Sequence, residues 1–126
     1  MLLNLTNHPS ANWSEEQARE ARRRWASVVD LPFPAVGADW TGGQLKDCAD
    51  RVLAEVSAME PDAVLCQGEM GLTCLLVAGL QRRGIPVYAA TSDRVSVETA
   101  AADGTVVKKA VFRFVAFREY PMIGGV

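Results

Sequence analysis

The segment from Ala63 to Leu80 constrains the fold more than any other part of the chain. It begins with an apolar run at residues 63–66, continues through the glycine-containing turn at residues 67–73, and ends in an almost uninterrupted apolar stretch. A short buried strand followed by a buried helix is typical of parallel α/β sheets. The turn presents free backbone N–H groups at a helix start, where the helix dipole favours negative charge. The sequence therefore predicts an α/β sheet with a phosphate site at this turn.

The same alternation of strand and helix extends over the first two thirds of the chain. Capping boxes, in which Ser or Thr precedes Gln by three residues, begin at Ser14 and Thr41 and predict helix starts there. Gly84 ends the helix that follows the central turn, and because this helix is apolar on nearly all sides we expect it to be buried on more than one side. The expected elements are strand 2–5, helix 14–24, strand 28–31, helix 41–59, strand 63–66, helix 71–83 and strand 86–90.

The pattern changes after residue 90. Residues 96–101 and 105–117 flank Asp103-Gly104, a strong signal for a β-hairpin, and the second segment is rich in valine and phenylalanine. Phe112 and Phe114 are expected to be core residues. The whole pattern predicts an α/β fold: a Rossmann-like, mostly parallel sheet flanked by helices, with a C-terminal antiparallel β-hairpin, in a single domain over residues 1–126.

Composition excludes several classes of function. With 126 residues, 49% of them hydrophobic, and a net charge of −2, the chain can bury one core and lacks the basic surface of a protein that binds long nucleic acids. No apolar run approaches a membrane span. Three dispersed cysteines are expected to be small core residues in a reducing compartment, so we expect a cytoplasmic protein. One histidine and these cysteines cannot form a usual zinc or iron site, and neither a metal nor a cofactor is expected.

Three polar loops follow predicted strands, at residues 6–10, 67–73 and 91–94, and ligands of α/β sheets bind beyond the carboxyl ends of the strands. His8, the only histidine, is suited to proton transfer, or is equally well a surface or capping residue. The glycines of the second loop permit close approach to a phosphate, or serve only a tight turn.

Two charged residues of these loops have open interpretations. Arg94 is the best phosphate contact because its planar guanidinium is always charged; alternatively it is a surface arginine paired with Asp93 or Glu98. Glu69 would repel a phosphate. It is therefore expected to accept a hydrogen bond from a ribose hydroxyl or an adenine amine, or to favour the helix N-terminus.

Residues 65–73, 88–94 and 112–120, together with the strand and histidine loop at the start, resemble the small CRISPR-associated proteins of type III systems that consist of one CARF-like domain. These families include ring nucleases, which bind cyclic oligoadenylate across a homodimer and linearise it to switch off antiviral signalling. The resemblance implies metal-independent cleavage, with cyclic tetra-adenylate as the expected ring. The ribose 2′-OH attacks the neighbouring phosphorus and leaves a 2′,3′-cyclic phosphate.

The resemblance and the loops together suggest roles for individual residues. Arg94 would stabilise charge, His8 would transfer a proton and Thr73 would position a phosphate. The other expected ligand-binding residues are Asn7, Ser10, Gln67, Gly68, Glu69, Met70, Gly71, Thr91 and Ser92. The alternatives are a protein that binds the messenger without cutting it, a phosphotransferase or nucleotide-sugar domain, and an interaction subunit whose loops only turn corners.

Overall fold

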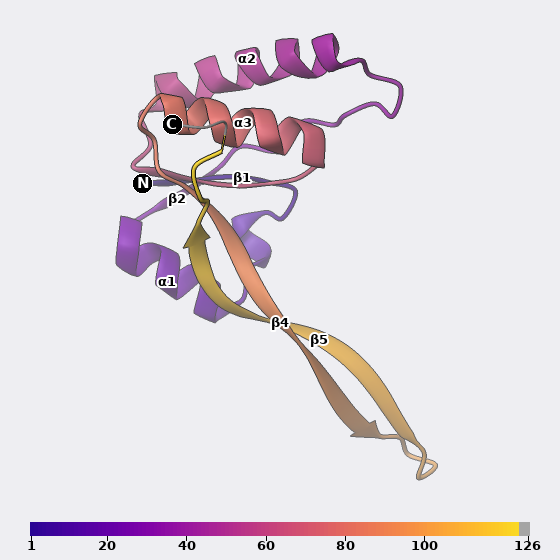
Figure 1. The fold of residues 1–126 in the computed structure, drawn as a ribbon. Helices are drawn as coiled ribbons and strands as arrows, with labels where there is room; N and C mark the ends of the chain where they lie inside the picture. Colours follow the sequence, from indigo (N-terminus) through magenta and orange to yellow (C-terminus); the bar gives the residue numbers. More distant parts are fainter. Residues whose placement is uncertain (124–126) are drawn as a thin grey trace.

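A five-stranded mixed sheet carries helices on both of its faces (Figure 1). The computed structural model describes residues 1–123, and the strands lie in the order β2-β1-β3-β4-β5. All neighbouring strands are parallel except β4 and β5, which form the predicted antiparallel hairpin. The elements are β1 (Leu2–Thr6), the 3-10 helix η1 (Ser10–Asn12), α1 (Glu15–Trp25), β2 (Val28–Asp30), α2 (Gly42–Met59), β3 (Ala63–Gln67), α3 (Met70–Arg82), β4 (Val87–Ala100) and β5 (Val106–Glu119).

The first two long helices begin where their capping residues predict. The Ser14 hydroxyl accepts a hydrogen bond from the backbone N–H of Gln17 at the start of α1. At the start of α2, Thr41 and Gln44 form a complete capping box, in which each side chain accepts from the other residue's backbone N–H. Each cap satisfies backbone donors that the first turn of a helix leaves unpaired. These helix starts are local signals, and the structure confirms them.

The central strands β1 and β3 are buried on both faces, as expected of strands that lie between helices. Leu3 and Leu5 pack with Val64 and Cys66 under α2 and α3, while Leu2 packs on the α1 side with Ala63 and Leu65. Figure 1 shows α2 and α3 together on one face and α1 on the other. Within residues 1–123, no helix is long and apolar enough to cross a membrane.

Helix α3 is covered by the sheet and by α2, and one side of it is open. Leu72, Leu76 and Leu80 are fully buried in the core, but the side of the helix facing away from the sheet is open. Met70 is 80% exposed and Leu75 is 37% exposed. The expectation that α3 is buried on more than one side is confirmed within residues 1–123, because the sheet covers one side and α2 another, where Gly79 lies directly against Leu53; the rest of its circumference is exposed.

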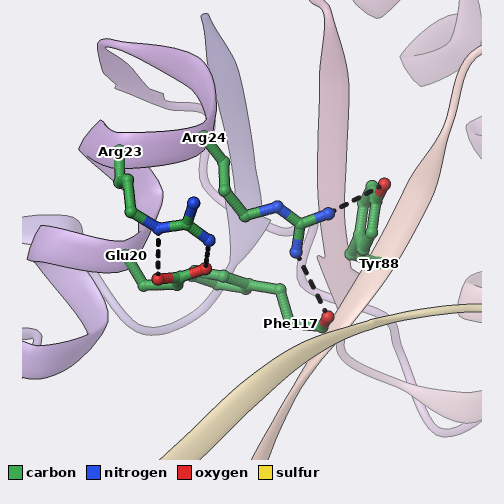
Figure 2. Close-up of polar contacts among 5 residues, drawn as sticks. All are labelled: Glu20, Arg23, Arg24, Tyr88 and Phe117. Atoms are coloured by element: carbon green, nitrogen blue, oxygen red, sulfur yellow. Dashed lines mark hydrogen bonds and ion pairs between the residues drawn. The ribbon is translucent and has the colours of Figure 1, made fainter.

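Arg24 attaches the end of α1 to the sheet (Figure 2). Its guanidinium donates to the backbone carbonyl of Phe117 at 3.4 Å and to the Tyr88 hydroxyl at 3.3 Å. It also lies over the rings of Trp25 and Tyr88, at 4.5 and 4.9 Å from their centroids. Such cation–π contacts contribute about 0.5–1 kcal/mol at exposed sites. Arg23, by contrast, pairs with Glu20 on the solvent side.

Strand β4 is longer than the sequence indicates. Residues 91–94 were expected to form a loop after a short strand, but they lie inside β4, which pairs with β5 all the way from Tyr88 to Ala100. The pairing of β4 with β5 is irregular at Thr91/Ser92. Figure 1 shows the two strands extending away from the rest of the domain as a twisted ribbon. We call residues 92–114 of this ribbon the arm. Phe112, expected in the core, lies on the arm and is 71% exposed.

The cysteines differ in accessibility. Cys48 and Cys66 are buried, as expected for small core residues, whereas Cys74 on α3 is exposed, so that expectation is wrong for Cys74. Burial raises the pKa of the Cys66 thiol to about 12. The thiolate is the reactive form of cysteine, so Cys66 is doubly protected.

Thiol labelling is therefore expected to be selective. In the native protein at pH 8, iodoacetamide should modify Cys74 and leave Cys48 and Cys66 unmodified. Peptide mass spectrometry, with protein unfolded in guanidinium as the control in which all three react, measures this. Rapid native labelling of Cys66 would contradict the burial of β3.

Candidate functional site

The sheet order reverses between β1 and β3, and a cleft opens at that point. The chain passes from β1 to β2 on one side and then to β3 on the other, so the loops after β1 and β3 diverge. In open α/β sheets this is where ligands bind. The cleft has a volume of about 980 Å³ and lies between these loops, the start of α1 and the base of the arm. It is lined by Thr6, Asn7, His8, Asn12, Trp13, Ser14, Glu15, Glu16, Gln17, Leu65, Gln67, Gly68, Ala90, Ser92, Val111, Phe112, Arg113 and Phe114.

A buried polar network holds the histidine loop in place. Asn4, only 1% exposed, donates from its amide to the His8 carbonyl and to Asp30 Oδ1, both at 2.9 Å. Thr6 donates its hydroxyl proton to Asn4 Oδ1 at 2.8 Å. Trp13 Nε1 also donates to the His8 carbonyl, at 3.0 Å. The backbone of residue 8 is thus fixed from several directions, while the His8 side chain is exposed at the cleft.

Gln67 closes the sheet beside the cleft. Its side-chain amide donates to the Ala90 carbonyl at 3.2 Å and accepts from the Ala90 N–H at 2.9 Å. In a parallel pair the two backbone groups of Ala90 would bond to two different residues of the neighbouring strand, but here one side chain takes both, so it acts as a last rung between β3 and β4. Beyond this rung, within residues 1–123, β4 has no neighbour on the β3 side. The cleft is therefore open on that flank.

The N-terminus of α3 is already capped from within the chain. Glu69 is its N-cap residue, and the Glu69 carboxylate accepts a hydrogen bond from the backbone N–H of Gly71. A carboxylate there satisfies the helix dipole and repels a second anion. Of the two alternatives for Glu69, the structure favours helix capping. It gives no support to a phosphate site at this turn.

Gly68 is required by packing. A Cβ at this position would lie 2.5 Å from ring atoms of Phe33, which is buried in the core under α2 and α3. Contacts below 3.0 Å do not occur without displacement of a neighbour. The glycine therefore lets the loop after β3 cross the Phe33 ring, in line with the simpler explanation of this turn.

The structure brings five of the expected site residues together at the cleft: Asn7, His8, Gln67, Gly68 and Ser92. The remaining seven do not line it. Ser10 is bonded to Asp30, the Thr91 hydroxyl donates to the Ala116 carbonyl, and the Thr73 hydroxyl is buried with no hydrogen-bond partner among the residues that the structure describes. Glu69, Met70 and Gly71 form the start of α3, and Arg94 lies on the arm with Ser96 and Lys108.

The cleft has more acidic than basic side chains. Glu15 and Glu16 lie at the start of α1, where carboxylates are favoured by the helix dipole. Arg113 is the only lysine or arginine among the described residues that line the cleft. Amides, hydroxyls and aromatic rings make up much of the rest. Such a lining suits the amine and hydroxyl groups of a base and a ribose better than it suits a cluster of phosphates.

Sequence reasoning missed several residues of the cleft, notably Glu16 and Phe112. Trp13, which the sequence left either as a base-stacking ring or, more often, as a packing anchor, is a buried packing residue whose indole N–H fixes the histidine loop. Phe112 reaches the cleft only because β4 and β5 are long and paired in this register. Within residues 1–123, no group of three His, Cys, Asp or Glu side chains is placed to hold a metal ion.

Comparison with protein families places the whole fold in one family. A family model described as the uncharacterized protein MJ1673 family matches residues 1–118. The chain belongs to this family. The match spans every described helix and strand of the MJ1673-family domain except the last residue of β5, so the cleft and the arm both lie within it. No curated protein matches the chain.

Proposed function

We propose that this MJ1673-family protein is a Rossmann-like, CARF-like ring nuclease, which binds cyclic oligoadenylate at the cleft and linearises it without a metal ion. The observation that carries the proposal is the single histidine, held by its backbone at the edge of a cleft at the switch point of the sheet. The resemblance of residues 65–73, 88–94 and 112–120 to small type III CRISPR-associated proteins supplies the substrate class. Cyclic tetra-adenylate is the expected ring, and switching off antiviral signalling is the proposed role.

The cleft residues fit a nucleoside. Glu16 and the Asn7 side chain offer acceptors for an adenine amine or a ribose hydroxyl, and the exposed Phe112 ring offers a stacking surface. Arg113 is suited to one phosphate. A cyclic oligoadenylate carries several phosphates. Positively charged side chains from outside one cleft would therefore have to bind the phosphates that Arg113 does not contact.

The reaction needs geometry and proton transfer. The ribose 2′-OH gives up its proton, its oxygen bonds to the adjacent phosphorus, and the 5′-oxygen leaves and takes a proton. His8 is proposed to transfer one of these protons, and Arg113 to stabilise the charge on phosphorus. Arg94 remains a candidate for this charge only if it comes from a second copy, since it does not line the cleft of its own chain.

Incubation with cyclic tri-, tetra- and hexa-adenylate in EDTA tests the proposal. We expect the protein to bind the tetra-adenylate ring and to convert it to linear products that end in 2′,3′-cyclic phosphate. Chromatography and mass spectrometry detect both the bound ring and these products. Binding without product would favour the second candidate, a sponge or sensor for the same messenger. If the protein neither bound nor cleaved any of the rings, both the ring nuclease and the messenger sponge or sensor would be rejected.

A further inference from the structure

One edge of the arm has no partner in the chain. Beyond Tyr88, within the described residues, β4 pairs only with β5, and the Gln67 amide takes both backbone groups of Ala90 on the other side. Backbone groups alternate in direction along a strand, so every second residue from Ser92 to Ala100 points its N–H and C=O away from β5. An exposed edge of this kind is a template for pairing with another chain.

We propose that this β4 edge pairs antiparallel with the same edge of a second copy, about a two-fold axis at Ser96. Ser96 is the midpoint of the free edge. This edge begins at Ser92, the first residue after the Gln67 rung whose outward backbone groups have no partner among the described residues, and it ends at Ala100, the last residue of β4. This register uses the whole free edge of both copies. An isologous contact of this kind closes after two copies.

Side chains complement one another in this register. Residues placed equally far from Ser96 face each other on the same side of the sheet, so Arg94 of one copy lies opposite Glu98 of the other. Val95 likewise lies opposite Val97, which is 41% exposed in the single chain. The symmetry makes each pair twice. Favourable cross-strand pairs contribute about 0.2–1 kcal/mol each.

The other edge of the arm is less suitable. A two-fold pair of β5 edges centred on Ala110, the midpoint of residues 106–114, would place Lys108 of one copy opposite Phe112 of the other and Lys109 opposite Val111, so it forms no pair of opposite charges there. Glu98 already lies 3.9 Å from Lys108 of its own chain, but both side chains are largely exposed, so this contact leaves Glu98 available.

The pairing would also affect the cleft. In this register Ala100 of the partner lies opposite Ser92, which lines the cleft, and next to the Gln67 rung at its open flank. The partner's hairpin turn would then border the opening. The pairing itself does not rest on the proposed function, because it follows from the strand edge alone.

Charge reversal tests the register. Sedimentation of the wild-type chain is expected to show a dimer. Arg94→Glu and Glu98→Arg should each weaken the dimer at least about tenfold in Kd, which is 1.4 kcal/mol. The double variant, which restores opposite charges, should recover most of the loss. Lys109→Glu makes the same change of charge as Arg94→Glu on the other strand and should not alter Kd.

Circular dichroism checks that each variant folds, and no loss is expected at these exposed positions. A monomeric wild-type chain, single variants with unchanged Kd, or a double variant as weak as the singles would each overturn the proposal. None of these measurements involves a nucleotide. Their failure is therefore distinguishable from failure of the ring-nuclease proposal.

Discussion

Replacement of His8 by alanine is expected to slow ring cleavage by about 100- to 10,000-fold, the range that positioned proton transfer contributes. The change should leave the fold intact, because the loop is anchored through the backbone of residue 8. The His8 carbonyl accepts from Asn4 and Trp13, and the His8 N–H donates to the Thr6 hydroxyl. Single-turnover cleavage of cyclic tetra-adenylate, measured beside thermal melting, separates the loss of chemistry from the loss of folding.

His8→Gln is the matched variant for this experiment. Glutamine keeps a polar side chain of similar reach but cannot accept and release a proton at neutral pH, so its rate should fall as far as that of His8→Ala. Ring binding should persist in both variants. Asn7→Ala, at a neighbouring cleft position, should instead weaken binding more than it slows bound substrate. A His8→Ala protein that cleaves within threefold of wild type would remove His8 from the mechanism.

The charge of the cleft decides how a ring of phosphates could be held. Glu15 and Glu16 line the same cleft as His8, and Arg113 lines it from the arm. A single cleft would therefore bind a base more readily than a phosphate backbone. A C2 dimer would present two clefts to one symmetric ring, and the pairing proposed for the arm would place Arg94 beside the partner's arm. Binding stoichiometry of one ring per two chains would agree with this arrangement.

Local signals predicted much of the fold. Capping residues fixed the starts of α1 and α2, and short apolar runs located β1 and β3, because these features depend on neighbours in the sequence. The prediction failed at residues 91–94, whose polar side chains are typical of a loop. There the ladder with β5 outweighs local preference, and the strand continues to Ala100. The pairing of β4 with a strand that is distant in the sequence cannot be read from the few residues around positions 91–94.

The candidate site was predictable only in part for the same reason. The loops after β1 and β3 could be placed because strand ends attract ligands, and His8 and Gln67 do lie at the cleft. The role of Gln67 was not predictable, because its side chain bonds to Ala90 across the sheet where a ligand contact was expected. For Glu69 the sequence left a ligand contact and the helix N-terminus open, and the side chain caps its own helix.

Asn4→Leu is expected to lower the free energy of unfolding by about 2–4 kcal/mol. Leucine fills a similar volume but removes the two donors that reach His8 and Asp30 and the acceptor that Thr6 uses, in a site that is 1% exposed. Each buried polar group left unpaired costs about 1–3 kcal/mol. Urea denaturation, monitored by tryptophan fluorescence, measures the change, and Trp13, which is hydrogen-bonded to the loop, is one of the three tryptophans that contribute to the signal.

Asn12→Ala is the control for that experiment, because Asn12 is exposed on η1 and a surface change of this kind should stay within about 0.5 kcal/mol. Cleavage by the folded fraction of Asn4→Leu should also fall, since the carbonyl of residue 8 loses one of its anchors while the His8 side chain is unchanged. If stability fell and the rate per folded molecule did not, the network would hold the fold without positioning His8. If neither changed, the buried asparagine would have no part in ordering the cleft.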